Sequence, residues 1–463
     1  MVNLKNKIAK IASLCLTMIL AISSLSMLPV QASQATFTIV NPYENVNWAT
    51  TGQYRAAHHT HTTFSDGSNT RLDMLIDLYN KGFDIVAITD HDTTTVSWDA
   101  LPYTGSWNNN WEAIGTAIPT TAQMNALRNG TFDAAEFRGS FTGRRQQFNG
   151  MISMGASNEI SAQGGFVDPD GTVVYVGYHI NAFFAQVPGD IGLTRTAGVA
   201  DADRNTGTMR EVLQIVQDAG GLTHLNHPGR YTGAHLGGIN GNESVARDPV
   251  HVARHVSLFM EFPSLVGMEI INKWDGESRN DRIFWDQILM QTMPQGRPVW
   301  GFSNDDSHML TGNGHAWNVM LMPELTEEAV RESMVTGAFY GVTRVDRRHG
   351  INHRWPDGTL VPGTPPQTRS AVDQYTGGTH NNFALQLLAE PTPSISNIIV
   401  DGSRISIQGR DFHTVIWIAD GEIVHIGNMI DVSAVLGINS YIRAELIGAY
   451  GVAYTQPFGI IRN

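Results

Sequence analysis

Two histidines and a carboxylate lie close together near position 60 of this 463-residue chain. His59 and His61 are two residues apart, so on a β-strand both rings point to the same side. Asp66 follows, next to Gly67, where the chain can turn back. Two imidazoles and a carboxylate at a strand end suit a divalent metal ion. A surface loop with incidental histidines is the alternative explanation for this stretch taken alone.

Similar residues recur downstream, each time after a short apolar run. The run Phe83–Ile88 is rich in β-branched residues, and an amphipathic helix expected over Asn69–Lys81 precedes it. A strand, a helix and a strand with polar residues at the carboxyl ends of the strands is the layout of an α/β-barrel active site. No structural need calls for histidine at successive strand ends, so we expect one shared site. The polar residues at the predicted strand ends are His59, His61, Asp90, His91, Glu159, His227, Asp306 and His308.

Over about residues 55–345 the chain resembles the polymerase and histidinol phosphatase (PHP) family of metal-dependent phosphoesterases. The family's motifs appear in order: His-x-His with Ser-Asp-Gly, Thr-Asp-His, a glutamate at a strand end, His-Pro-Gly and Asp-x-His. The resemblance implies a distorted (β/α)7 barrel that holds two or three divalent ions (Zn²⁺, Mn²⁺ or Fe²⁺), with Glu159 bridging them. The metal ligands that it implies are His59, His61, Asp66, His91, Glu159, His179, His227, Asp306 and His308.

Two assignments in this ligand set require a choice between neighbouring residues. Many members of the family carry a histidine where this chain has Val174; we take His179 as its substitute, because some relatives use a His followed by Ile-Asn. The Asp-x-His spacing selects Asp306 and leaves Asp305 as a nearby helper. Three further polar residues are expected to pack or to orient ligands rather than to bind metal: His58, Asp90 and His224.

The resemblance implies hydrolysis of a phosphomonoester or phosphodiester by a metal-bound hydroxide. Asp306 or a nearby histidine could protonate the leaving oxygen, and spacing does not choose between them. Arg230 follows the His-Pro-Gly turn and is the first candidate to grip a phosphate oxygen, with a surface ion pair as the equal alternative. The expected catalytic residues are thus Glu159, Arg230 and Asp306, and the expected partner is a small phosphorylated substrate or a nucleotide.

Two other functions stay open. A metallohydrolase of the same architecture could cleave an amide, an ester or a lactone, because its ligands would be similar and few fixed cations are evident for a phosphate. The third possibility is a surface binding protein in which the C-terminal β-domain binds the ligand and the barrel is vestigial. The intact ligand set argues against it.

The rest of the chain divides by composition. Residues 1–32 combine three lysines, an apolar run and small residues at their end, which indicates a cleaved secretory signal. An uncleaved membrane anchor is the alternative, because the run is long enough to span. The further predicted segments are an exposed lead-in at 33–54, the barrel at 55–347 with an insertion over its mouth at 97–150, a linker at 348–383 and an immunoglobulin-like β-sandwich at 384–463.

Charge and cysteine content exclude several functions. The only cysteine, Cys15, lies in the predicted signal, so cysteine catalysis and thiolate zinc sites are not expected. Without the signal the net charge is −16 (27 basic and 43 acidic residues), which disfavours nucleic-acid binding by diffuse electrostatics. We expect a secreted or extracytoplasmic protein whose β-sandwich packs against the barrel, with cell-wall contact as the weaker option.

Overall fold

The computed structural model describes residues 37–103, 118–132, 150–167, 173–189, 191, 207–232, 243–272, 278–344 and 390–462. The predicted signal, the linker and most of the predicted insertion at 97–150 lie outside these ranges. No helix within them is long and apolar enough to cross a membrane. Phe37–Arg462 forms one compact unit.

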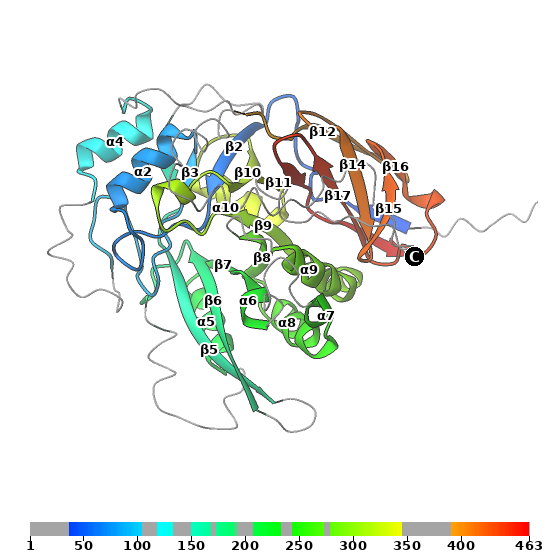
Figure 1. The fold of residues 1–463 in the computed structure, drawn as a ribbon, viewed down its shortest axis with the longest axis horizontal. Coiled ribbons are helices and arrows are strands. Elements are labelled where there is room, and N and C mark those ends of the chain that lie inside the picture. The colour runs from blue at the N-terminus through cyan, green and yellow to red at the C-terminus, as the bar shows by residue number, and fades with distance from the viewer. Residues whose placement is uncertain are drawn as a thin grey trace, which may run out of the picture. The chain divides into compact units, whose positions relative to one another are not determined.

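An eleven-stranded sheet joins strands from the start, the middle and the end of the chain (Figure 1). Its main path runs β1 (Phe37–Val40), β19 (Phe458–Arg462), β17 (Tyr441–Ile447), β18 (Val452–Tyr454), β11 (Phe339–Thr343), β10 (Ala316–Met322), β2 (Gly52–Ala57), β3 (Ile85–Val86) and β4 (Ile152–Ser153). Off this path, β14 (Thr414–Ala419) pairs with β17 and with β15 (Glu422–Ile426). Only the β2–β3–β4 portion is parallel.

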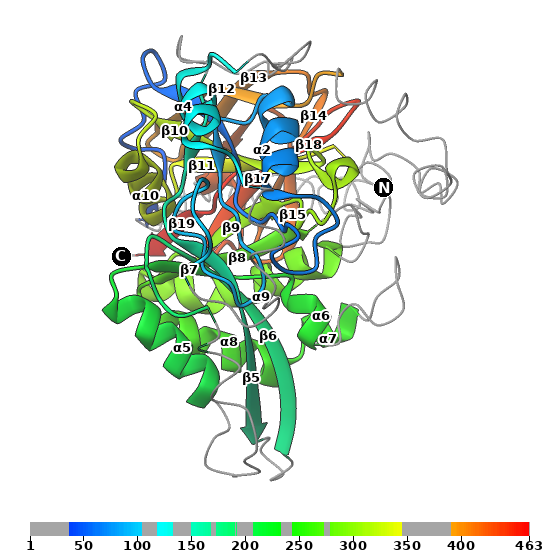
Figure 2. The ribbon, with the colours of Figure 1, turned by 90° about the vertical axis from the view of Figure 1, so that its left-hand side faces the viewer.

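A five-stranded sheet carries the other half of the predicted barrel. Its order is β5 (Ser157–Val167), β6 (Val173–Phe183), β7 (Leu222–Leu225), β8 (Leu265–Asn272) and β9 (Trp300–Asn304). Figure 2 shows the long antiparallel β5–β6 ladder reaching past the neighbouring helices. The helices that pack with this sheet in one apolar core are α5 (Gly207–Asp218), α8 (Pro249–Glu261) and α9 (Ser278–Thr292). Short segments adjoin them: α6 (Pro228–Thr232), α7 (Glu243–Ala246) and η4 (Met293–Gln295).

A three-stranded sheet near the C-terminus faces the large sheet. It consists of β12 (Ser394–Asp401), β13 (Arg404–Arg410) and β16 (Met429–Asp431), followed by η6 (Val432–Ala434). Ile395 and Ile407 from this sheet share an apolar core with Trp417 and Leu446 from β14 and β17. Apolar residues at alternate positions of both sheets therefore fill the space between them, as in sheet-on-sheet packing.

Capping residues fix the ends of three helices, the first of which lies where the sequence pattern predicts it. In α2 (Arg71–Asn80), Thr70 accepts from the backbone N–H of Asp73. A capping box of Thr120 and Gln123 opens α4 (Thr121–Asn129). In α10 (Glu327–Thr336), Thr326 is the N-cap, and Gly337 ends the helix at φ 77°. The remaining short helix is η5 (Leu310–Gly312).

The described strands do not close into one barrel ladder, which differs from the (β/α)7 expectation. The fold is mixed α/β, and between the two larger sheets the chain makes only isolated bridges, such as Thr60 to Ser307 and His91 to Glu159. β3 is two residues long, but backbone hydrogen bonds continue beyond it: the N–H of Ala87 donates to the carbonyl of Ala57 at 2.9 Å, and that of Thr89 to the carbonyl of Thr60 at 2.8 Å.

The terminal segments also differ from the expected separate pieces. β18 pairs with β11, so strands from 384–463 continue the sheet that holds β10 and β2. β1 pairs with β19 and Tyr43 is buried, so Phe37–Tyr43 is part of the folded unit and not an exposed lead-in, while residues 33–36 lie outside the described ranges. Pairing partners far along the chain leave no local sequence signal, which is why composition alone separated these segments.

Candidate metal centre

Two neighbouring segments carry four of the predicted ligands: His59 and His61 after β2, and Asp306 and His308 after β9. A parallel bridge between Thr60 and Ser307 joins the two segments. The backbone N–H of His61 donates to the carbonyl of Ser307 at 2.8 Å. The bridge therefore places the predicted ligands that flank Thr60 next to those that flank Ser307.

Asp90 holds the loop that carries Asp66. Its carboxylate accepts from the backbone N–H of Thr62 at 2.6 Å, from the Thr62 hydroxyl at 2.7 Å and from the Ser65 hydroxyl at 2.8 Å. The loop turns tightly, because the N–H of Gly67 donates to the carbonyl of Thr62 at 3.0 Å. A Cβ at Gly67 would lie 2.7 Å from the Thr62 backbone, so only glycine fits there. Asp90 therefore supports the loop backbone and not a histidine ring.

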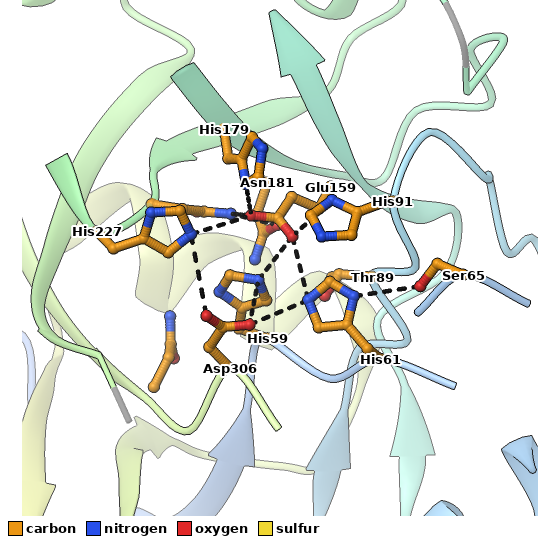
Figure 3. A network of polar contacts seen from close by, with 12 residues as sticks. His59, His61, Ser65, Thr89, His91, Glu159, His179, Asn181, His227 and Asp306 are labelled. Atoms are coloured by element: carbon orange, nitrogen blue, oxygen red, sulfur yellow. Dashed lines mark hydrogen bonds and ion pairs between the residues drawn. The ribbon is translucent and has the colours of Figure 1, made fainter. Parts of the chain in front are cut away.

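Glu159 lies on β5, fully buried, at the centre of the cluster (Figure 3). Its carboxylate faces five imidazoles from four segments of the chain. The nearest distances from a Glu159 oxygen to a ring nitrogen are 3.1 Å for His59, 3.1 Å for His61, 3.2 Å for His91, 2.9 Å for His179 and 3.3 Å for His227. A carboxylate with this many imidazole neighbours can bridge adjacent ions.

Strand register explains why His179, and not Val174, reaches the cluster. On β6, Asn181 pairs directly with Glu159, and His179 lies two residues along on the same face. Val174 pairs with Phe166, far up the ladder from Glu159. The substitution assumed from the sequence thus agrees with the register, and no other described residue of β6 contacts Glu159 through a ring nitrogen.

Three overlapping groups of side chains could each hold a metal ion, since their ligand atoms lie within 4.8 Å of one another. They are His59, His61, Glu159 and Asp306; then His91, Glu159 and His179; and finally His61, Asp66, His91 and His308. The first group is completely buried, and the last reaches solvent through Asp66, whose side chain is 37% exposed. The cluster therefore has a closed inner side and an open outer side.

The hydrogen bond that His59 makes indicates that a cation fits the buried group. His59 Nδ1 lies 2.7 Å from the carboxylate of Glu269, so Nδ1 carries a proton, and when the ring is neutral its lone pair is on Nε2. That Nε2 faces Glu159 at 3.1 Å and Asp306 at 3.4 Å. Among the described residues, His59 Nε2, His61 Nε2 and Glu159 Oε2 find no partner with hydrogen-bond geometry. Buried lone pairs that face buried carboxylates need protons or metal ions between them.

The cluster shifts the pKa values of its own members. Burial alone would raise the pKa of Glu159, but the histidines around it, His59 first, hold that pKa well below its ordinary value. Burial would lower the pKa of His61, but contacts with Asp306 and Glu159 raise it to about 9. The pKa of His91 is lowered to about 4, chiefly by burial. A divalent ion that binds here would displace protons from histidines such as His61 and compensate the charge of the carboxylates in their place.

Two ligand positions have a left-handed backbone, which is rare for residues other than glycine. The φ angle is 28° at His227 and 44° at Asp306. Such conformations cost of order 1–3 kcal/mol each and persist where the surrounding contacts fix them. At His227 one such contact is a hydrogen bond from its backbone N–H to Glu269 at 2.8 Å. Strain at these two positions is typical of a functional site.

The sequence analysis did not identify the residues that form hydrogen bonds to the predicted ligands. Asn226 donates to Glu159 at 2.8 Å, and Asn272 donates to Asp306 at 3.3 Å. Glu269 on β8 is buried and contacts His59. The only sequence signal was Glu269 itself, because an acidic residue inside an apolar strand needs buried partners.

Asp305 has a structural role instead of helping its neighbour Asp306. Its carboxylate accepts from three consecutive backbone N–H groups, those of Gly314 at 2.5 Å, His315 at 2.9 Å and Ala316 at 2.7 Å. This carboxylate therefore fixes the turn that leads into β10.

The other residues considered in the sequence lie around the cluster. The ring of His58 packs 5.9 Å from Phe183 and 5.7 Å from Phe302, and His224 stacks on Phe302 at 4.6 Å, so both histidines belong to the packing beneath the site. Arg230 lies on α6 with an exposed side chain, and its role in gripping phosphate stays a prediction.

No family model matches the sequence, and neither does any curated protein. Solved structures do. One, from Bacteroides vulgatus, is described as a two-domain protein containing a predicted PHP-like metal-dependent phosphoesterase; the identity is 13% and the TM-score 0.36, over 89% of this chain and 96% of that one.

Two further structures cover less of the chain. A protein from Bifidobacterium adolescentis, assigned as a metal-dependent phosphoesterase, shows 15% identity and a TM-score of 0.28 over 61% of this chain and 96% of its own. A lesion-specific endonuclease from Pyrococcus furiosus shows 12% identity and a TM-score of 0.28 over 73% of this chain and 72% of its own. Solved structures similar to this chain thus include PHP-like metal-dependent phosphoesterases, the family whose motifs its sequence resembles.

Proposed function

We propose that this protein is a metal-dependent hydrolase that cleaves phosphomonoesters or phosphodiesters. The observation that carries the proposal is the convergence on Glu159 of five imidazoles from four separate segments, with buried ring nitrogens and carboxylate oxygens directed at one another. Ligands of this kind suit two or three ions of Zn²⁺, Mn²⁺ or Fe²⁺. When bound, such ions would lower the pKa of water and stabilise charge on phosphoryl oxygens.

The proposed role of each residue follows from how deeply it is buried in the site. Glu159 is shared by two of the ligand groups and would hold adjacent ions together. Asp66 and His308 lie on the open side, where a substrate can enter, and contact each other at 3.2 Å. Asp306 belongs to the buried group and is our candidate to protonate the leaving oxygen. Arg230, exposed on α6, is our candidate to hold a phosphate oxygen.

The proposal includes the setting of the site. We infer that the two larger sheets are an opened, distorted form of the PHP (β/α)7 barrel, and that the facing C-terminal sheets have an immunoglobulin-like arrangement. We also infer that residues 1–32 are a secretory signal and that the mature protein acts outside the cytoplasm on a small phosphorylated substrate or nucleotide. The basic start and apolar run of that segment support this inference.

The proposal is tested with the purified protein lacking residues 1–32. Hydrolysis of an aryl phosphomonoester and an aryl phosphodiester is measured with a chelator and after addition of Mn²⁺ or Zn²⁺. We expect turnover that depends on the added metal and is lost in His61→Ala, while circular dichroism shows that the variant is folded. His413→Ala, which changes an exposed histidine, is the matched control and should keep full activity.

The outcomes separate the competing functions. Full turnover by His61→Ala would place the active site elsewhere. Metal-dependent hydrolysis of amides, esters or lactones, with none of either phosphate ester, would favour the second function considered above. A protein that contains no metal and hydrolyses none of these substrates would contradict an enzymatic role.

A further inference from the structure

Glu269 is a buried carboxylate on β8 that accepts four hydrogen bonds from groups around the candidate metal centre. The donors are His59 Nδ1 at 2.7 Å and Asn304 Nδ2 at 2.8 Å to one oxygen, and the His227 backbone N–H at 2.8 Å and Asn272 Nδ2 at 2.8 Å to the other. Both oxygens are therefore occupied only as acceptors. None of the motifs found in the sequence includes this residue.

These bonds reach three predicted ligands that lie on different strand ends. His59 is contacted through its ring and His227 through its backbone, where φ is 28°. Asp306 is reached indirectly, because Asn272 donates both to Glu269 and to Asp306, the latter at 3.3 Å. One side chain thus connects the ends of β2, β7 and β9 beneath the centre.

We propose that Glu269 is a positioning residue for metal binding, which keeps the proton of His59 on Nδ1 and thereby directs the lone pair of Nε2 to the ion in the buried ligand group. This inference rests on the metal centre proposed above. A carboxylate behind a metal-bound histidine fixes the tautomer and orientation of the ring and makes its other nitrogen a better ligand. Here it also holds the backbone of His227.

Replacing Glu269 by glutamine tests the idea at constant size. An amide has one acceptor oxygen and one NH₂ donor group, whereas all four partners of Glu269 are donors. Whichever way the amide turns, its NH₂ faces two donors. If it faces His59, the ring can accept from it only by moving its proton to Nε2, and Nε2 then cannot bind an ion. If it faces the His227 N–H, the strained backbone loses its partner.

The consequence should be confined to one side of the cluster. His59 belongs to the buried group with His61, Glu159 and Asp306. The outer group of His61, Asp66, His91 and His308 contains no residue that Glu269 contacts. We therefore expect Glu269→Gln to weaken binding of the inner ion by about 10- to 100-fold, the usual effect of losing such a partner. The affinity for the outer ion should be nearly unchanged.

The experiment is a Zn²⁺ titration of the full mature chain against a competing chelator of known affinity. Wild type, Glu269→Gln and the matched control Glu445→Gln are compared. Glu445 is also a buried carboxylate, but its partner is Arg443 Nη1 at 2.6 Å on β17. The control can lose stability, yet its Zn²⁺ affinities should equal those of the wild type. A purely structural role for Glu269 would lower stability in the same way without a selective loss of one ion.

Failure of the two proposals can be told apart. If the wild type binds no Zn²⁺, the metal centre itself is wrong and this inference falls with it. If the wild type binds Zn²⁺ and Glu269→Gln binds every ion equally well, the metal centre stands and the role of Glu269 is overturned.

A second measurement needs no variant of Glu269. In the Zn²⁺-loaded wild type labelled with ¹⁵N-histidine, nuclear magnetic resonance reports which ring nitrogen carries the proton. The resonances of His59 are assigned as those missing from His59→Gln. We expect the proton on Nδ1. A proton on Nε2 would overturn the inference even if Glu269→Gln failed to fold.

Discussion

The carboxylates of the cluster differ most in their access to solvent. Glu159 is buried, whereas the Asp66 side chain is 37% exposed and contacts His308 at 3.2 Å. We expect Asp66→Asn to remove one ion from the outer group, because an amide is a weaker ligand, and to leave the buried ions in place. Metal analysis after dialysis should show a lower metal content per chain, but not zero.

A matched variant on the surface is Asp401→Asn, which changes an exposed carboxylate at the end of β12. Its metal content should equal that of the wild type. Loss of every ion from Asp66→Asn would show that the inner and outer groups do not fill independently.

His255 gives a prediction about acid stability. The ring is buried between Tyr178 and Phe284 and its Nδ1 contacts the carbonyl of His251 at 2.8 Å. Burial lowers the pKa of His255 to about 4. An unfolded chain titrates its histidines near 6.5, so between about pH 6.5 and 4 the unfolded state binds a proton that the folded state does not. This contribution to stability is complete above pH 6.5 and is lost as the pH falls.

The measurement is urea unfolding at pH 7.5 and pH 5 for the wild type and His255→Leu. The wild type should lose more unfolding free energy between the two pH values than the variant, since leucine does not titrate. Other histidines and the metal centre contribute equally to both proteins and cancel in the comparison. An equal loss in both would show that His255 can take up its proton without unfolding.

At this scale the residues that gather around Glu159 were predictable from sequence, because histidine and carboxylate at strand ends carry a chemical signal that is independent of the fold. The residues that support them were not. Glu269, Asn226 and Asn272 act through strands that are neighbours only in the folded chain. Asp305 shows the converse, since proximity in sequence to Asp306 suggested a shared role and its carboxylate instead fixes a turn.

At the scale of elements, a buried ion pair connects a C-terminal strand with a helix of the central region. Arg443 on β17 contacts Asp286 on α9 through two bonds of 2.8 Å and Glu445 at 2.6 Å. Tyr441 also donates to Asp286, at 2.6 Å. Arg443→Met would remove the cation that both buried carboxylates contact. We expect a loss of about 3–5 kcal/mol in the free energy of unfolding, measured with urea.

Arg404→Met is the matched control for this ion pair. Arg404 pairs with Asp431 at 3.3 Å, but its side chain is 63% exposed. An exposed pair contributes about 0–1 kcal/mol, so this variant should unfold almost like the wild type. Equal losses from the two arginine variants would mean that the buried network does not connect β17 to α9 as we infer.

Helices could be predicted from the sequence because their signals are local. Thr70, Thr326 and Gly337 mark helix ends within a few residues of the apolar pattern they bound. The sheets could not be predicted in the same way. Contacts between residues distant in the chain determine that β18 pairs with β11. Such contacts also determine that β5 meets the 87–95 segment through isolated bridges. The expectation of a distorted (β/α)7 barrel came from the family resemblance and the order of elements, and neither specifies where a ladder is interrupted.

For the whole molecule, the shared eleven-stranded sheet predicts that the C-terminal part cannot be removed without harm. A chain ending at residue 347 would lack β17, β18 and β19 and would expose the edge of β11 and the apolar residues that pack beneath it. We expect this truncated chain to be insoluble or unfolded, and the full mature chain to unfold in one cooperative transition. Circular dichroism during heating measures both. A soluble, cooperatively folded 33–347 fragment would restore the picture of two independent domains.

The pairing of β1 with β19 has a mechanical consequence. The strands are antiparallel, and Phe37 lies opposite Arg462, so both outer ends of the described chain leave the ladder at the same point. A force that pulls these two ends apart acts along the hydrogen bonds and opens them one residue pair at a time, instead of shearing all of them together. We therefore expect a pulling force on the two ends to separate β1 from β19 first, before it disrupts the strand ends around Glu159.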